Sequence, residues 1–302
     1  MTAPEPLVQT ARVGRLTVHA IQAGGQQLDG GAMFGVVPKP LWERRIAADA
    51  RNRIPLGMRC LLVEHDDGLV LVDTGLGNKE DAKFRDIYGV ENAGAAGRTR
   101  LEDGLAALGH RPEDVRHVVL THLHFDHAGG ATYRDERGGV GVSFPNARYT
   151  VQRGEWEYAT HPNERTGGSY LAANYEPLAA AGVLDFADGA REVVPGVRVV
   201  PAAGHTPHHQ IVLIESAGET LGFLADLVPT AAHLPLPWIM GYDVEPLVTL
   251  ETKRRVLAQA AAENWLVVFE HDVAVPWGRV RHDGRTYALA PDPNAAARAV
   301  AG

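Results

Sequence analysis

The sequence contains very little cysteine: Cys60 is the only one among 302 residues. A single cysteine excludes an intrachain disulfide and disfavours a metal site built from thiolates. No apolar run approaches the roughly 18 residues that a membrane-spanning helix needs. The N-terminal segment also lacks the basic start and apolar core of a secretory signal. These absences predict a soluble protein of the cytoplasm with no membrane partner.

Positive charge is scarce as well. Lysine is rare, and the formal net charge at pH 7 is -8. Because proteins that bind nucleic acid usually concentrate basic residues on one surface, this balance predicts no nucleic-acid partner. The longest basic run, Lys253-Arg254-Arg255, is expected on a solvated face of a helix.

Repeats, low-complexity stretches and linker-like segments are absent too, so we expect a single domain over residues 1–302. Short apolar runs bounded by polar turns predict strands, and apolar residues at helical spacing predict helices. Strands are expected at 15–21, 60–64, 69–73, 117–121, 197–201, 210–214, 220–224 and 265–269, and helices at 101–108 and 246–262. In the second helix, the residues that fall on one apolar face are Leu247, Leu250, Leu257 and Ala261.

Several predicted strands run directly into a histidine or aspartate. His122, His205, Asp226 and His271 each follow the end of a short apolar run. Strand ends from different parts of a sheet can lie side by side, and loops at the ends of core strands often carry the chemistry of a protein. The sequence therefore predicts a metal site on the rim of a sheet.

The richest segment is THLHFDHAGG, residues 121–130. In an extended chain, His122 and His124 point to the same side, and both can reach one cation at about 2.0–2.1 Å. A tight turn after Phe125 would aim Asp126 and His127 at a second position, and the small residues that follow permit close backbone packing. An isolated His-x-His is a weak signal, but four such side chains in six positions would be costly without a partner.

Most of the other histidines are not expected to bind metal, because a lone histidine usually has no ligand role. This group consists of His19, His65, His110, His117, His161, His208, His209, His233 and His282.

Three more segments accompany THLHFDHAGG: GHTPHHQ (204–210), FLADLV (223–228) and EHD (270–272). Together the four segments resemble the metallo-β-lactamase superfamily, from about Asp73 to His271. The resemblance implies an α/β (α+β) fold, the four-layer αββα sandwich, with a metal site at one edge of the two sheets. It also implies two divalent metal ions per chain, most directly Zn²⁺, although iron, manganese or cobalt also suit nitrogen and oxygen ligands.

The resemblance further implies a role for each metal-type residue. The first ion would be held by His122, His124 and His205, the second by Asp126, His127 and His271, and both by a bridging Asp226. Asp73 and His209 would support these ligands from behind. Asp73 can also be read as a plain turn residue that caps Gly75.

Such a pair of ions supports hydrolysis, in which a metal-bridging hydroxide attacks a lactone, ester or phosphoester. Asp126 is then the candidate to pass a proton to the leaving group, although a ligand role competes with this. The ligand spacing resembles the lactonase and organophosphate-hydrolase branch, but the tyrosine that acyl-homoserine lactonases carry after the bridging aspartate is missing from Asp226-Leu227-Val228-Pro229-Thr230.

Other functions on the same fold stay open. One is a hydroxyacylglutathione-type thioester hydrolase, which is disfavoured because the roughly thirty residues after His271 look irregular and Ala-rich instead of forming a helical domain. A mononuclear iron oxygenase and a non-catalytic metal-binding protein are the others. The chain retains Asp126 and His127, which argues for two ions. This argues against a mononuclear oxygenase and against a non-catalytic protein that has lost metal ligands.

Residues 30–42 are apolar and rich in glycine, without regular periodicity. Long irregular loops are often functional, so the segment 24–56 is expected to line a substrate pocket or to form an interface, which leaves a homodimer open. An apolar pocket would favour a small, neutral or apolar ester-like substrate. The candidate pocket residues are Met33, Phe34, Trp42, His233, Trp238 and Tyr242. The alternative is that the apolar ones, Met33, Phe34, Trp42 and Trp238, pack the core or a dimer interface.

Overall fold

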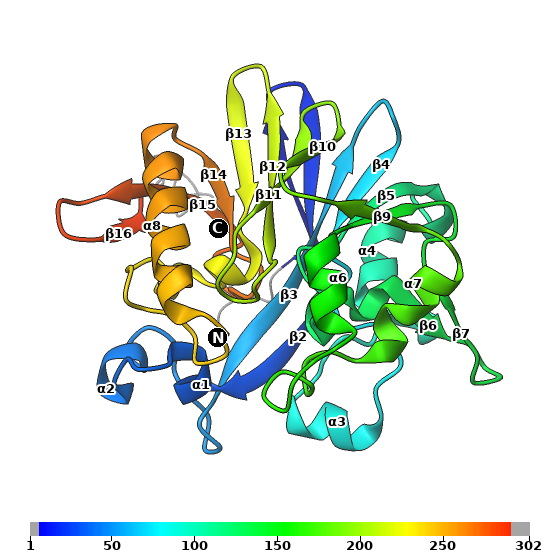
Figure 1. Cartoon of the computed structure of the whole chain (residues 1–302), viewed down its shortest axis with the longest axis horizontal. Helices are drawn as coiled ribbons and strands as arrows, with labels where there is room; N and C mark the ends of the chain where they lie inside the picture. Colours follow the sequence, from blue (N-terminus) through cyan, green and yellow to red (C-terminus); the bar gives the residue numbers. More distant parts are fainter. Residues whose placement is uncertain (1–5, 291–302) are drawn as a thin grey trace.

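Two seven-stranded sheets face each other in the computed structural model, which describes residues 6–290. Figure 1 shows α8 (Pro246–Ala262) on one outer side of the sheets, and α4 (Arg100–Ala107), α6 (Arg153–Ala159) and α7 (Glu176–Ala180) on the other. The four layers confirm the predicted αββα sandwich.

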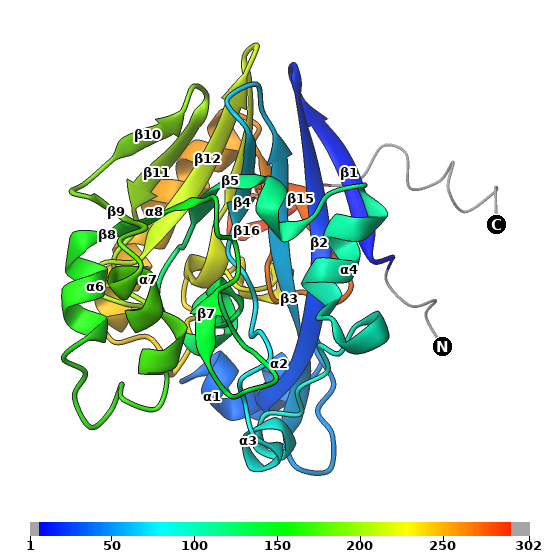
Figure 2. The same cartoon turned by 90° about the vertical axis from the view of Figure 1, so that its right-hand side faces the viewer.

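The first sheet has the strand order β1-β2-β3-β4-β5-β8-β9. Its strands are β1 (Val8–Val13), β2 (Leu16–Asp29), β3 (Arg53–Glu64), β4 (Leu69–Val72), β5 (Val115–Val119), β8 (Arg148–Gln152) and β9 (Leu184–Ala187). A separate hairpin pairs β6 (Thr132–Arg134) with β7 (Val140–Val142). Figure 2 shows this sheet behind α4, which crosses β2.

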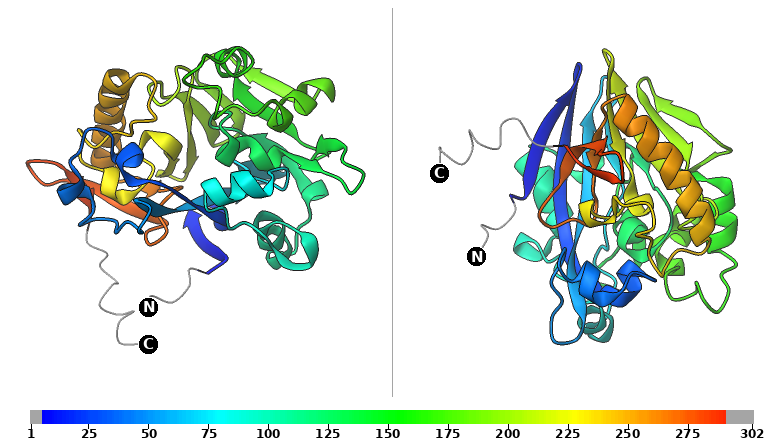
Figure 3. Two further views of the ribbon diagram at one scale, coloured as in Figure 1. Left: turned by 90° about the horizontal axis from the view of Figure 1, so that it is seen from below. Right: turned by 90° about the vertical axis from the view of Figure 1, so that its left-hand side faces the viewer.

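The second sheet has the order β10-β11-β12-β13-β14-β15-β16. Its strands are β10 (Arg191–Val194), β11 (Val197–Pro201), β12 (Gln210–Ser216), β13 (Glu219–Phe223), β14 (Leu266–Val268), β15 (Trp277–His282) and β16 (Tyr287–Leu289). The side view in Figure 3 shows α8 lying across the outer face of this sheet.

Short helices fill the connections. The α-helices among them are α1 (Gly30–Phe34), α2 (Lys39–Trp42), α3 (Ala82–Ile87) and α5 (Phe125–Ala128). The 3-10 turns are η1 (Ala95–Gly97), η2 (Pro112–Asp114), η3 (Gly129–Ala131), η4 (Ala172–Asn174), η5 (Ala225–Leu227) and η6 (Ala231–His233). No helix within residues 6–290 is long and apolar enough to cross a membrane.

Strand alternation builds the layers, because successive side chains of a strand point to opposite faces. In β3, Leu61 and Val63 pack between the two sheets, whereas Leu62 packs against the helices that cover the first sheet. In β12, Val212 lies between the sheets and Leu213 faces α8. Both sheets are therefore buried on two faces, which explains their continuous apolar runs.

All predicted strands and helices lie at the expected places, but some bounds were wrong. β2 and β3 continue well beyond the predicted 15–21 and 60–64, because the two strands pair with each other from Thr17 opposite Glu64 to Asp29 opposite Arg53. Their polar and glycine-containing outer halves gave no apolar run to detect.

The segment 24–56 was expected to be a loop, and the structure shows regular elements there instead. It contains the end of β2, the helices α1 and α2, and the start of β3. The chain after His271 was also misread as irregular, since β15 and β16 close the second sheet. Residues 291–302, which supplied the Ala-rich impression, lie outside the described residues.

The predicted apolar face of α8 was only partly right. Leu257 is buried and Leu250 and Ala261 are half-buried, but Leu247 is 77% exposed. The buried side chains of the helix are Thr249, Thr252, Lys253, Val256, Leu257 and Ala260. Lys253, expected in solvent, is only 1% exposed.

Candidate metal centre

The segment after β5 places two pairs of metal-type side chains on either side of Phe125. The chain remains extended up to His124 and then enters α5. A short helix therefore replaces the predicted tight turn. Asp126 and His127 lie on the first turn of this helix and are both buried.

Two glycines allow the end of this segment to pack directly on the loop after β4. A Cβ atom on Gly129 would lie 2.2 Å from the carbonyl oxygen of Leu76, and one on Gly130 would lie 2.1 Å from that of Thr74. Because both neighbours are backbone atoms, neither position tolerates a larger residue. The close packing holds α5 against the strand end that carries Asp73.

The remaining metal-type residues come from the second sheet. His205 follows β11, Asp226 lies in η5 directly after β13, and His271 follows β14. Thus the first sheet supplies the THLHFDHAGG segment and the second sheet supplies the other donors. The strand-end pattern predicted donors at the rim of a sheet but not their division between two sheets.

A first group of nitrogen and oxygen donors is formed by His122, His124, His205 and Asp226, whose nearest ligand atoms all lie within 4.8 Å of one another. Nε2 of His205 lies 3.1 Å from Nδ1 of His124 and 2.9 Å from Oδ2 of Asp226. All four side chains are buried.

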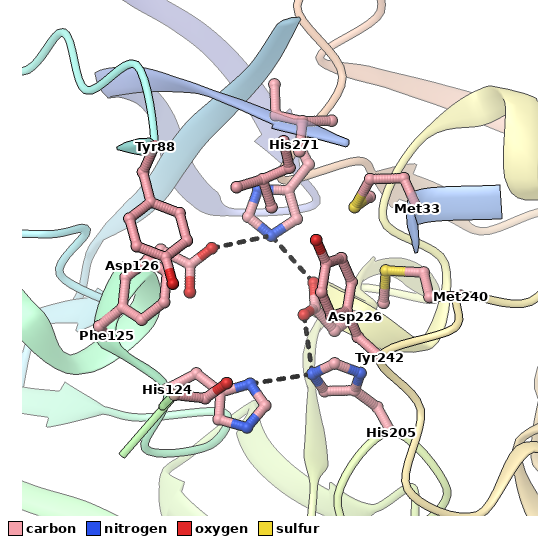
Figure 4. A pocket seen from close by; sticks show the side chains of 13 residues that line it. Met33, Tyr88, His124, Phe125, Asp126, His205, Asp226, Met240, Tyr242 and His271 are labelled. Carbon is pink, nitrogen blue, oxygen red and sulfur yellow. Dashed lines mark hydrogen bonds and ion pairs between the residues drawn. The ribbon is translucent and has the colours of Figure 1, made fainter. Parts of the chain in front are cut away.

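A second group consists of Asp126, His127 and His271, again with donors within 4.8 Å. The Nε2 atoms of His127 and His271 are 3.3 Å apart. Asp226 reaches this group too, because its Oδ1 lies 2.9 Å from Nε2 of His271. The Asp226 carboxylate therefore lies between the two groups, with one oxygen toward each (Figure 4).

The donors fit metal ions in spacing and in chemistry. Four nitrogen ligands arranged tetrahedrally at about 2.0–2.1 Å from an ion stand about 3.3 Å apart, close to the two histidine–histidine separations. Within residues 6–290, the buried Nε2 of His122 has no hydrogen-bond partner. A buried nitrogen without a partner is costly, and a cation in the first group would use its lone pair.

The outer nitrogens of three histidines are fixed from behind. Nδ1 of His127 lies 3.0 Å from Oδ2 of Asp73, and Nδ1 of His205 lies 2.9 Å from Oδ1 of Asp243. Nδ1 of His271 lies 2.7 Å from the carbonyl oxygen of Gly57. Such contacts make Nδ1 the donor and direct Nε2 toward the centre, where it can bind a cation.

Asp73 and His209 both lie beside histidines of the donor groups. Asp73 also accepts hydrogen bonds of 2.7 Å from the backbone N–H and the hydroxyl of Thr121, so its carboxylate braces the start of the histidine segment. The ring of His209 lies 5.2 Å from that of His122, and its Nδ1 is 3.2 Å from the carbonyl oxygen of Ala202.

The electrostatics of the cluster favour a cation. Burial acts to raise the pKa of Asp226, but His205, His127 and His271 hold it well below its ordinary value. Burial lowers and Asp226 raises the pKa of His205, and the balance is a rise to about 10. Burial and the neighbouring imidazoles lower the pKa of His122 well below its usual range, which keeps this ring neutral and able to bind metal.

Comparison with known proteins places this site in a family. The sequence profile of the Metallo-beta-lactamase superfamily matches residues 55–271. An N-acyl homoserine lactonase from a Bacillus species is 31% identical over 230 residues, which cover 73% of this chain and 83% of the relative. The chain belongs to the metallo-β-lactamase superfamily.

Solved structures agree with this membership of the superfamily. A probable metal-dependent hydrolase from Staphylococcus aureus has 31% identity and a TM-score of 0.83, with 93% of this chain and 99% of that chain covered. An N-acyl homoserine lactone hydrolase with the product N-hexanoyl-L-homoserine at its catalytic metal centre has 25% identity and a TM-score of 0.64, with 87% and 95% covered. The chain is thus a metal-dependent hydrolase of the metallo-β-lactamase superfamily.

A small cavity of about 70 Å³ opens beside the metal-type residues (Figure 4). Its apolar wall is made by Leu28, Met33, Leu56, Phe125 and Met240, and its polar part by Tyr88, Ser169 and Tyr242. Met33 and Tyr242, two of the expected pocket residues, therefore line it.

The other four expected pocket residues do not line this cavity. The ring of Phe34 stacks on His233 with centroids 4.5 Å apart and on Trp42 at 5.3 Å, and meets the edge of Trp238 at 5.7 Å. His233 is fully buried, and its Nε2 lies 2.9 Å from the carbonyl oxygen of Met33. These four residues form an aromatic layer behind the cavity wall. The expectation that they line the pocket was wrong, and for Phe34, Trp42 and Trp238 the alternative of core packing is confirmed.

Several residues that hold the site gave no sequence signal. Gln26 on β2 donates a hydrogen bond from Nε2 to Oδ2 of Asp126, and Asp243 follows a proline-rich loop. Glu270 directly precedes His271 in the sequence, and this adjacency was the one sequence feature that pointed to a role at the site. Its Oε1 is 3.1 Å from Nδ1 of His127, and neither carboxylate oxygen accepts a hydrogen bond within residues 6–290.

Proposed function

We propose that the chain is a dinuclear-metal lactonase that hydrolyses small, neutral lactones. The observation that carries the proposal is the pair of donor groups, joined by Asp226, at the base of a small and mainly apolar cavity. The matched Bacillus relative is a lactonase, which supports the same substrate class.

The residues suggest how two ions, most directly Zn²⁺, would be held. His122, His124 and His205 would bind the first, Asp126, His127 and His271 the second, and Asp226 both. When bound, such ions lower the pKa of a water molecule from 15.7 towards about 7 and polarise the substrate oxygen.

The cavity would orient the lactone and keep bulk water away. Leu28, Leu56 and Phe125 offer apolar contact to the ring and its substituent. They leave charged substrates without compensating partners, because no lysine or arginine lines this cavity among residues 6–290. Burial of a charge without a partner is costly, which favours a neutral substrate.

Two phenols are available to hold the substrate's oxygen atoms. Tyr88 and Tyr242 line the cavity, and neither hydroxyl makes a hydrogen bond within residues 6–290. Burial and the nearby Asp29, Tyr88 and Asp126 raise the pKa of Tyr242 to about 12, so it remains a donor at neutral pH. We assign to Tyr242 the role of the tyrosine that is missing after Asp226.

Asp126 is placed to move the proton that the leaving alkoxide needs. Its carboxylate lines the cavity, and one oxygen already accepts from Gln26. The amide holds the carboxylate in one orientation, so Asp126 can serve as ligand through one oxygen and exchange a proton through the other.

The proposal is tested with protein purified without chelator. Elemental analysis is expected to find close to two transition-metal ions per chain, and a panel of lactones, aryl esters, phosphotriesters and thioesters is expected to show lactones as the best substrates. One ion or none would overturn the dinuclear centre. Preference for a thioester or phosphotriester would overturn the substrate class and leave the metal centre standing.

A further inference from the structure

A fully buried glutamate lies outside the donor groups and joins the loops that carry them. Glu155 is on α6, and its side chain is 0% exposed. Its Oε1 accepts hydrogen bonds from the backbone N–H of Leu123, at 3.1 Å, and from the hydroxyl of Tyr170, at 2.9 Å. Its Oε2 accepts from the hydroxyl of Thr206, at 2.6 Å. Every donor comes from a different segment.

Two of the donors are sequence neighbours of the first metal group. Leu123 lies between His122 and His124, and Thr206 directly follows His205. One carboxyl group is therefore bonded to a loop of the first sheet and a loop of the second sheet, at the place where both deliver imidazoles.

The bond to Leu123 has a direct geometric consequence. In the extended His122-Leu123-His124 segment, the backbone N–H of Leu123 is directed at the carboxyl group of Glu155. Glu155 supplies a buried acceptor for that N–H, which otherwise would be an unpaired buried donor. Three hydrogen bonds to one buried carboxyl group therefore hold the loop firmly.

The third donor connects the first group to the cavity. The ring of Tyr170 packs against the imidazole of His124, with centroids 4.8 Å apart. The preceding Ser169 lines the cavity, and its carbonyl accepts a 3.0 Å hydrogen bond from the backbone N–H of Phe125. Glu155 therefore also fixes the wall that touches His124.

We propose that Glu155 is a positioning residue that assembles the first metal group by clamping the His122–His124 and His205 loops together. The inference rests on the proposed function only in requiring that the chain binds metal; it is independent of the substrate. Within residues 6–290, no hydrogen bond joins Glu155 to Asp126, His127 or His271. Loss of the clamp should thus lower the affinity for the ion of the first group and leave the affinity for the other ion unchanged.

The experiment uses metal-free full-length protein titrated with Co²⁺, whose absorption spectrum reports ligand geometry without any substrate. Wild type is compared with Glu155→Ala, Glu155→Gln and Glu157→Ala. Glu157 is exposed on the same helix and is the matched control. Glutamine retains Oε1 for Leu123 and Tyr170, and its amide can donate to the Thr206 hydroxyl, so it should restore most of the clamp.

For Glu155→Ala, the affinity for one of the two Co²⁺ ions is expected to fall by about tenfold or more, with the other unchanged. In a His271→Ala background, which leaves the first group alone, the same change should weaken the one remaining tight ion. Glu155→Gln should recover most of the affinity and the spectrum, and Glu157→Ala should match wild type.

The inference would be overturned if Glu155→Ala left the affinity for both ions unchanged or lowered both equally. It would also be overturned if Glu155→Gln lost as much affinity as Glu155→Ala. If Glu155→Ala does not fold, Thr206→Val removes one of the three bonds and should show a smaller loss at the same ion; no loss there overturns the inference too. Wild type that binds no metal would overturn the metal centre itself. Two ions without lactone hydrolysis would overturn only the proposed substrate.

Discussion

At the scale of single residues, Tyr242 lines the cavity and is the side chain to which we assign the hydrogen bond to the substrate. We expect Tyr242→Phe to lower kcat/KM for a lactone by about tenfold, because one hydrogen bond to the substrate contributes about 1 kcal/mol or slightly more. Steady-state kinetics on the best lactone of the panel checks this. The metal content should not change.

Tyr133→Phe is the matched control, since Tyr133 lies 46% exposed on the β6–β7 hairpin and does not line the cavity. Tyr88→Phe distinguishes the two cavity phenols. Full activity of Tyr242→Phe combined with loss in Tyr88→Phe would move the donor role to Tyr88.

Glu270 is a second residue with a testable role, because it places an extra carboxylate behind His127. Glu270→Gln keeps the shape of the side chain but removes the ionisable carboxyl group that lies behind His127 of the second group. We expect metal affinity there to fall by about tenfold or more, measured by competition with a chromophoric chelator. Glu219→Gln changes an exposed glutamate and should behave as wild type. Unchanged affinity in Glu270→Gln would show that this carboxylate is not needed for the ion.

The chemistry of the site was readable in the sequence at this scale, but its supports were not. His122 to His127 form a dense local cluster of residue types that rarely occur together without a metal. Asp243 and Gln26 act through contacts with residues that are distant in the sequence, so the spacing of residues along the chain does not indicate these contacts. His233 was expected in the cavity as a hydrogen-bond donor to the substrate. In the structure its ring stacks on Phe34, and its Nε2 contacts the carbonyl oxygen of Met33.

At the scale of elements, α8 positions the chain segment that ends at Asp243. Lys253 donates hydrogen bonds from Nζ to the carbonyl oxygens of Pro235, at 2.9 Å, and Trp238, at 2.8 Å. The segment continues to Met240 and Tyr242, which line the cavity. A buried lysine thus fixes the cavity wall to the helix, although its position next to two arginines suggested a solvated face.

Burial lowers the pKa of Lys253 to about 7. In the unfolded chain a lysine has a pKa of about 10.4. Between these two values the unfolded state binds more protons than the folded state, so this residue makes stability rise with pH, by at most about 1.4 kcal/mol per pH unit. Below about pH 7 both states are protonated and the slope vanishes.

Lys253→Met removes this contribution, and the difference in unfolding free energy between wild type and variant should grow from pH 7 to pH 9 in favour of wild type. Urea denaturation at pH 6, 7, 8 and 9 measures it, and the shifts of all other groups cancel in the difference. Arg255→Met, at an exposed neighbouring position, should give parallel curves. Parallel curves for Lys253→Met as well would show that Lys253 keeps an ordinary pKa.

Strands and helices were predictable where their packing produces a periodic pattern of apolar residues. They were not predictable where only backbone hydrogen bonds to a neighbouring strand define them. The sequence predicted correct bounds for Val197–Pro201 and Pro246–Ala262, because apolar residues recur along both segments. The outer half of the β2–β3 pair contains residues such as Gln26 and Gly57 and is a strand only because the two chains bond to each other. The apolar face of α8 was misplaced because Leu247 is exposed while Thr249 and Lys253 are buried.

At the scale of the whole molecule, the donor groups connect the two sheets. One sheet supplies the loop after β5, and the other supplies His205, Asp226 and His271. Ions bound between them would stabilise the folded state by mass action, since the unfolded chain cannot arrange these ligands. The sandwich itself was predictable from the resemblance of the motifs, but the side chains that unite its halves, above all Glu155, were not.

Metal removal should therefore destabilise the entire fold. At a metal concentration of about a thousand times Kd, one ion stabilises the folded state by about 4.1 kcal/mol, which corresponds to a rise of about 6 °C in Tm for a chain of this size. Thermal unfolding followed by circular dichroism, with and without prior chelation, measures the shift, and added Zn²⁺ should restore it. His124→Ala should reduce the restoration, whereas His161→Ala, at an exposed histidine outside the donor groups, should leave it intact. An unchanged Tm after complete chelation would mean that the two sheets are held in place without the ions, and that the donor groups are assembled by the protein alone.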